Sequence, residues 1–217
     1  MGEVQSDGDY NQLRLYADIF LYGNAATADL AVIVGDEIRH HWNSPNASIR
    51  IKNEWHVLKF IITAIYTPLL TIDEVQQNIN PRNNYFRVEE YVRGNISYVD
   101  GIYSNTGMFK RDNLLNGSTT AAHEFGHTLG LVHPSNTDIR GKGQPGIMYP
   151  RGTLVDPQFQ YDPNAEPRKP GGTMNPAHRK VFINDIADLR LYALSFNDIG
   201  FAVQGEFSSV WHEADQP

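Results

Sequence analysis

Residues 123–133 read HEFGHTLGLVH, and this stretch governs how the rest of the chain is interpreted. On a helix, His123 and His127 lie one turn apart on the same face, so their imidazoles can bind a single metal ion. Glu124 is poorly placed as a third ligand from that face, but it can reach a water in an open coordination position and act as its general base. The pattern therefore predicts a helix that carries a metal site.

The end of the same stretch supplies a third ligand. Gly130 lets the chain leave the helix, because a residue without a side chain readily adopts the left-handed backbone common at helix ends. The resulting turn can bring His133 back to the metal. With eight histidines in 217 residues, HExxH alone would be a moderate signal. The added glycine and histidine at fixed spacing make chance a poor explanation.

The pattern HExxHxxGxxH, followed by a turn with a methionine, resembles that of the metzincin zinc metalloendopeptidases. The turn is the sequence GIMYP at residues 146–150. The resemblance implies that Met148 lies beneath the histidines as an apolar floor. Pro134 is a serralysin-like feature, whereas the turn is more similar to that of matrixins. A serralysin-like tyrosine ligand would fall at Pro150, so we transfer no tyrosine ligand and leave open a transition-state contact of Tyr149.

The resemblance also implies a fold of the α+β class, a metzincin-like zincin. Its upper lobe, residues 1–133, would hold a twisted, mostly parallel sheet with helices and the active-site helix. Its lower lobe, residues 134–217, would be smaller and irregular, with the methionine turn and a final helix. The expected organisation is a single catalytic domain over residues 1–217.

The function implied by the resemblance is zinc-dependent hydrolysis of peptide bonds in proteins. One catalytic Zn2+ would be held by His123, His127 and His133, and Glu124 would activate a zinc-bound water. A protein or peptide substrate would bind in extended form along the strand expected at residues 96–103, which is equally well explained as an ordinary sheet edge.

Two alternatives remain open. The first is a protease of narrow specificity, such as a toxin or effector module of a larger secreted protein. The second is a zinc-stabilised binding module without catalysis. The intact Glu124 argues against the second alternative, because a structural zinc site gains nothing from a general base.

Composition excludes several other classes. A hydrophobic content of 41% and a charged content of 20% are typical of a globular chain that can bury a core. The net charge of −7 argues against nucleic acid and anionic membranes as partners. The chain has no cysteine, which removes disulfides, thiolate metal sites and a cysteine-based latency switch. Oligomeric state is not predicted.

No signal peptide is visible at residues 1–10, because no basic segment leads into an apolar run. No stretch approaches the length of a membrane span. Either the protein works inside the cell, or a signal, pro-segment or larger carrier lies outside this chain. Metzincins are mostly secreted, so we expect the second, a secreted or extracellular protein.

Periodicity predicts the regular elements. We expect a flexible start at 1–10, strands at 13–22, 49–52, 57–67, 85–92 and 96–103, helices at 27–42, 71–80 and 177–194, and a tail at 200–217 that packs back or continues toward another domain. On the helix at 27–42, the expected apolar positions are Leu30, Ile33, Val34, Ile38 and Trp42, with Asp29, Asp36, Glu37 and Arg39 toward solvent. His56 is expected to be solvated or to cap a turn.

Supporting roles fall to a few polar residues. Ser118 or Thr119 is expected to cap the active-site helix. The resemblance implies that Asp185 supports the methionine turn. Asp156 and Asp162 are possible Ca2+ ligands, but two separated aspartates are weak support for calcium.

Overall fold

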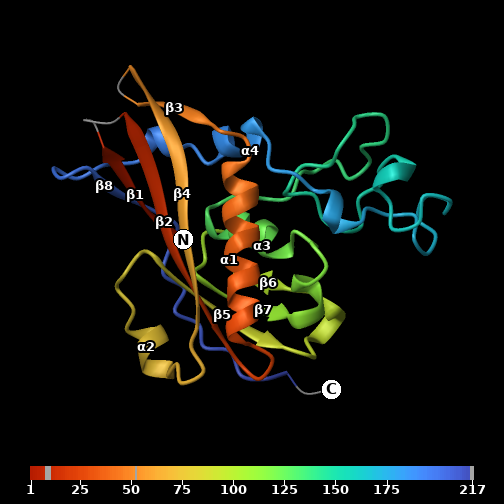
Figure 1. Ribbon diagram of the computed structural model, residues 1–217, viewed down its shortest axis with the longest axis horizontal. Coiled ribbons are helices and arrows are strands. Elements are labelled where there is room, and N and C mark those ends of the chain that lie inside the picture. The colour runs from red at the N-terminus through yellow and green to blue at the C-terminus, as the bar shows by residue number, and fades with distance from the viewer. Residues whose placement is uncertain (8–10, 52, 216–217) are drawn as a thin grey trace.

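The computed structural model describes residues 1–7, 11–51 and 53–215 (Figure 1). The strands are β1 (Gly2–Asp7), β2 (Gln12–Tyr22), β3 (Ser48–Ile51), β4 (Glu54–Tyr66), β5 (Asn83–Glu89), β6 (Tyr98–Val99), β7 (Thr106–Lys110) and β8 (Phe201–Gln204). The α-helices are α1 (Ala28–Asn43), α2 (Ile72–Gln76), α3 (Thr120–Thr128) and α4 (Ile183–Asp188). Short 3-10 turns occur at Arg93–Asn95, Arg111–Leu114, Pro157–Phe159, Pro176–His178 and Leu191–Ala193.

The sheet is curled and mixed, with the main strand order β3-β4-β2-β5-β7-β6. Strands β4, β2, β5 and β7 run parallel. The pairs β3–β4, β6–β7, β1–β2 and β1–β8 are antiparallel. The expectation of a mostly parallel sheet is therefore wrong for the outer strands, because short connections such as the one between β3 and β4 permit only antiparallel pairing. The α+β class is compatible with this arrangement.

Helix α1 packs against one face of this sheet and lies beside α3 (Figure 1). The helix begins where the Thr27 hydroxyl accepts a hydrogen bond of 3.1 Å from the Leu30 N–H. Its predicted apolar face is buried except for Ile33, which is 45% exposed. Trp42 is a core anchor as expected, since it is 1% exposed and its Nε1 donates to the Ala122 carbonyl at 3.0 Å. Helix α1 thus joins α3 to the sheet.

Long-range pairing at the two ends of the chain was not predicted. The expectation of a flexible start is wrong for residues 2–7, which form β1 between β2 and β8. Residues 8–10, 52 and 216–217, which the predictions also cover, lie outside the described residues. The tail packs back onto the body, as one of its two expectations had it: β8 joins the sheet, and the Trp211 ring stacks on Tyr22 at 4.7 Å between centroids.

Two predicted elements are shorter than expected. The strand at 96–103 is reduced to β6, and the next strand, β7, was missed. The helix at 177–194 is reduced to α4. Helix α4 begins late because the Asp185 carboxylate accepts the Phe182 N–H at 2.7 Å, and it ends early because Arg190 adopts a left-handed backbone (φ +51°).

The segment 134–175 is mostly irregular and projects from the sheet and helices (Figure 1). A small apolar cluster of Ile139, Val155 and Met174 holds it together. Elsewhere His56 is 4% exposed, so the expectation of a solvated side chain is wrong. Among the described helices, none has the length and apolar character needed to cross a bilayer.

Candidate metal centre

The three predicted histidines come together. His123 and His127 lie on one face of α3, and His133 follows the turn after that helix. The His133 Nε2 atom lies 3.1 Å from the Nε2 atoms of both His123 and His127. A tetrahedral metal ion with bonds of about 2.1 Å to nitrogen would space its ligands about 3.4 Å apart. The geometry therefore fits a bound metal ion with little rearrangement.

Backbone carbonyls orient two of these rings. His123 Nδ1 lies 2.6 Å from the Ile147 carbonyl, and His127 Nδ1 lies 2.7 Å from the Leu131 carbonyl. A carbonyl only accepts hydrogen bonds, so each Nδ1 donates and each Nε2 keeps its lone pair for a metal. Burial lowers the pKa of His127 to about 4, against the opposing effect of the Leu131 carbonyl and with smaller lowering effects of His133 and Arg179. Burial also lowers the pKa of His123 well below its ordinary value. Both rings are thus neutral, as metal ligation requires.

The turn after α3 depends on Gly130. Its φ is +102°, a left-handed conformation that favours glycine. A Cβ atom at this position would lie 2.0 Å from Cε1 of the Tyr103 ring. The Leu131 N–H donates back to the Gly126 carbonyl at 3.0 Å, which turns the chain so that the Leu131 carbonyl meets His127. Backbone freedom and close packing both require glycine here.

The methionine turn packs beneath α3, as the resemblance implies. Met148 is 3% exposed and lies against Gly126, where a Cβ atom would be 2.4 Å from its sulfur. The neighbouring Ile147 supplies the carbonyl that orients His123. Gly146 forms a parallel bridge with Lys180, which ties the turn to the segment before α4.

Glu124 lies beside the histidines without joining their ligand cluster. Its side chain is buried (6% exposed), and it lines the same cavity as all three rings. Burial raises the pKa of Glu124 to about 8, against the opposing effects of Arg179 and Arg151 and of the Val99 N–H. The carboxyl group is therefore in a position to exchange a proton with a molecule in the cavity.

Of the two residues predicted to cap the start of α3, Ser118 makes the bond and Thr119 does not. Thr119 occupies the cap position, but its hydroxyl donates to the Pro176 carbonyl at 2.6 Å instead. Ser118 does accept the Thr120 N–H at 3.3 Å. A second acceptor was missed: the Glu37 carboxylate of α1 accepts the Ala122 N–H at 3.0 Å.

Glu37 was expected to face solvent, because the helix periodicity places it among charged residues. Instead it is half-buried against α3. Burial raises the pKa of Glu37 to about 7, although hydrogen bonds from Ala122 and Ala121 and the charge of Arg179 lower it. No local sequence signal could have shown that α3 would lie beside this residue.

Arg179 is the second residue that the sequence did not reveal. It is 4% exposed and lines the cavity with the histidines and Glu124. Its Nε donates to the Thr119 hydroxyl at 3.0 Å, and Nη1 donates to the Tyr149 carbonyl at 3.2 Å. Burial lowers the pKa of Arg179 to about 10, which leaves it protonated at neutral pH. The cavity thus contains a fixed positive charge.

The cavity has a volume of about 480 Å³ and is bordered by β6 and the residues that follow it. It is lined by Ile96, Ser97, Tyr98, Val99, Gly101, Ile102, Thr120, His123, Glu124, His127, His133, Pro150, Arg151 and Arg179. The three histidines thus line a space large enough for an amino-acid side chain.

Other candidates lie elsewhere. Tyr149 packs against the cluster in the irregular segment and does not line the cavity. Asp185 bonds to the start of its own helix rather than to the methionine turn, although it lies next to Gly146. Asp156 accepts the Gly141 N–H at 2.7 Å. Neither Asp156 nor Asp162 joins a group of three or more acidic or histidine ligands within the described ranges.

No protein-family model matches this sequence, and a search of curated proteins finds no match. The assignment of the metal centre therefore rests on the geometry of this chain alone. That geometry shows three histidines that could bind a metal ion, a buried carboxyl group beside them, and a cavity that both line.

Proposed function

We propose that this chain is a zinc-dependent endopeptidase of the metzincin type, with residues 1–217 as its catalytic domain. The observation that carries the proposal is the convergence of three histidine Nε2 atoms beside the buried carboxyl group of Glu124. A closed structural site would not need an acid in the same cavity. A secreted location belongs to the same proposal and stays a prediction.

Zinc is the metal that best suits this donor set. Neutral imidazoles favour zinc among the common metals, and three protein ligands leave one position open. His123, His127 and His133 would hold the ion through Nε2, since both helical rings use Nδ1 for backbone carbonyls. When bound, zinc supplies Lewis-acid chemistry that polarises a peptide carbonyl and acidifies water.

Glu124 would do the proton transfer. Its carboxylate oxygen would accept a proton from the attacking water, and the resulting carboxyl group would donate that proton to the leaving amide nitrogen. The low exposure of the side chain keeps bulk water away from this exchange. Arg179 and Arg151, which face the same cavity, favour the charged form of Glu124.

The free edge of β6 supports an extended substrate. Among the described strands, β6 pairs only with β7 and ends the sheet order. Tyr98 and Val99 of this strand line the cavity. A peptide could add to the edge as a further strand, with its backbone held by hydrogen bonds and its side chains directed alternately into the cavity.

The test compares the zinc-loaded wild type with Glu124→Gln on an unfolded protein substrate, with zinc content measured on both samples. We expect equal zinc and the loss of nearly all cleavage in the variant. Glu54→Gln, at an exposed glutamate in β4, is the matched control and should cleave normally. Cleavage retained by Glu124→Gln would refute the assigned base.

The same experiment separates the alternatives. Zinc bound by the wild type without cleavage of any unfolded protein would favour the binding module. Cleavage of one folded target, without general proteolysis, would favour an effector of narrow specificity.

A further inference from the structure

Arg179 is a buried cation without an ion-pair partner among the residues that the structure describes. No carboxylate oxygen of the described residues lies within 4.0 Å of its guanidinium nitrogens. Buried charges are normally paired, because an unpaired charge loses its hydration without compensation. At 4% exposure, Arg179 has little access to bulk water. The buried position of Arg179 therefore favours the binding of an anion.

The guanidinium group of Arg179 is held in place, but not all of its N–H groups make hydrogen bonds within the described residues. Nε donates to Thr119, Nη1 donates to the Tyr149 carbonyl, and Nη2 donates to the Ser118 carbonyl at 3.5 Å. Each Nη atom makes a single bond within the described part of the chain and so retains a second N–H. Guanidinium N–H groups are the donors that pair best with a carboxylate.

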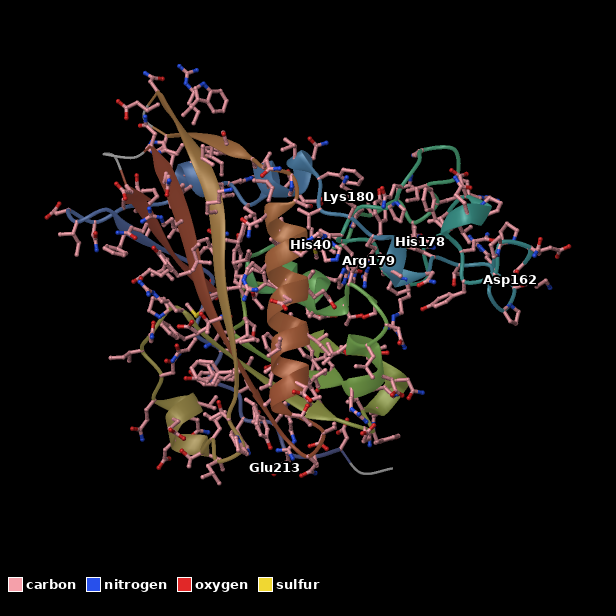
Figure 2. All side chains as sticks on the ribbon, viewed as in Figure 1. His40, Asp162, His178, Arg179, Lys180 and Glu213 are labelled. Atoms are coloured by element: carbon pink, nitrogen blue, oxygen red, sulfur yellow. The ribbon has the colours of Figure 1, made fainter. Side chains whose placement is uncertain are left out.

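The surroundings of Arg179 favour an anionic ligand. Figure 2 shows Arg179 between the helices and the projecting segment, with His178 and Lys180 on either side in the chain. Arg151 lines the same cavity, and among the described residues of that lining Glu124 is the sole acidic one. Because Glu124 is assigned to proton transfer in the proposed reaction, it is not available as a permanent partner of Arg179.

We propose that Arg179, assisted by the partly exposed Arg151, binds a substrate carboxylate in the cavity beside the metal centre. The substrate class is a peptide with Asp or Glu next to the scissile bond, or a peptide whose terminal carboxylate reaches the same place. This inference rests on the proposed function. It makes Arg179 a specificity-determining residue whose N–H groups contact the substrate.

A purely structural role is the competing explanation. Arg179 joins Thr119, at the start of α3, to the backbone of Tyr149, after the methionine turn. It could serve only to hold these segments together and, at longer range, to offset the charges of Glu37 and Glu124. In that case, the wild type would not distinguish a carboxylate from its amide isostere.

The experiment uses zinc-loaded wild type and quenched fluorescent peptides that differ only in Asp against Asn, or Glu against Gln, next to the cleaved bond. These peptides carry an amidated C-terminus. A second pair has neutral side chains and either a free or an amidated C-terminus. We expect the carboxylate form of one pair to have a kcat/KM roughly tenfold or more above its amide, in line with a charge-assisted hydrogen bond. The pair that shows the effect identifies the source of the carboxylate.

Variants assign the effect to Arg179. In Arg179→Gln the preference should fall to about one, whereas Arg179→Lys should keep part of it because the positive charge is retained. Arg50→Gln, at an exposed arginine of β3, is the matched control and should keep the full preference. The comparison of peptides on the wild type needs no variant. It therefore distinguishes carboxylate binding from a purely structural role even if Arg179→Gln fails to fold.

Binding separates this inference from the proposed function. The affinities of zinc-loaded Glu124→Gln for the same labelled peptides are measured by fluorescence anisotropy. Tighter binding of a carboxylate form by about tenfold, without cleavage by the wild type, would support the Arg179 site and refute the endopeptidase. Cleavage with equal kcat/KM and equal binding for every pair would overturn the Arg179 site and leave the endopeptidase standing.

Discussion

Met148 lies against Gly126 of α3 so closely that a Cβ atom on this glycine would be 2.4 Å from the sulfur and 3.2 Å from Trp42 Cζ2. Gly126→Ala should therefore lower the free energy of unfolding by about 1–3 kcal/mol through overpacking. The sign of this change is informative, because helix propensity alone would make the alanine variant more stable by about 1 kcal/mol. Urea denaturation measures the change.

Gly152→Ala is the control for this substitution. A Cβ atom at Gly152 meets nothing within 4 Å, so its free energy of unfolding should change by less than about 0.5 kcal/mol. A stabilised Gly126→Ala would contradict the close packing of Met148 on α3.

Gly130 and Gly141 separate backbone strain from steric clash. Both have positive φ, +102° and +76°, but only Gly130 faces another side chain, the Tyr103 ring. Gly141→Ala should cost about 1–2 kcal/mol for the left-handed backbone alone. Gly130→Ala should cost a further 1–3 kcal/mol, approximately, through the clash. Equal losses in chemical denaturation would show that the Tyr103 contact has no energetic effect.

Glu37 makes stability depend on pH. Burial raises its pKa from 4.5 to about 7 in the folded protein, so the folded state binds this proton more tightly than the unfolded state. The contribution is fully present below about pH 4.5 and is lost as the pH rises through about 7. Allowing for partial exposure, the loss is about 2 kcal/mol.

Glu37→Gln should remove this part of the pH dependence while its amide oxygen still accepts the Ala122 N–H. The pKa shift acts over roughly pH 5 to pH 8. Thermal or urea unfolding over this range measures how the stability of the variant differs from that of the wild type. Asp36→Asn, at an exposed neighbour on α1, is the control. Parallel pH profiles for wild type and Glu37→Gln would contradict the shifted pKa.

Metal removal should destabilise the protein. A ligand that binds only the folded state adds about 4 kcal/mol at a thousandfold excess over its Kd, so a chelator should lower the Tm of the wild type. His127→Ala should lose the metal, and the chelator should no longer change its Tm. His40→Ala, at an exposed position on α1, should behave as the wild type. Full metal retention by His127→Ala would count against the ligand set.

Local periodicity predicted the elements whose burial follows from their own sequence. Strand β2 alternates buried and partly exposed residues along most of its length, and α1 buries a stripe at helical spacing. Local periodicity failed for strands whose formation depends on pairing with distant parts of the chain. Strand β7 is short and almost wholly buried, so it lacks alternation, and β1 and β8 pair although they lie at opposite ends of the chain.

The sequence by itself determined which histidines come together, because the spacing of His123, His127 and His133 acts through one helical turn and one glycine turn. Only the tertiary structure decided what surrounds them. It brought the Ile147 carbonyl to His123, Glu37 to the start of α3, and Arg179 into the cavity. The physical reason is that these contacts join segments far apart in the chain, whose meeting depends on the packing of the sheet and helices and leaves no local pattern.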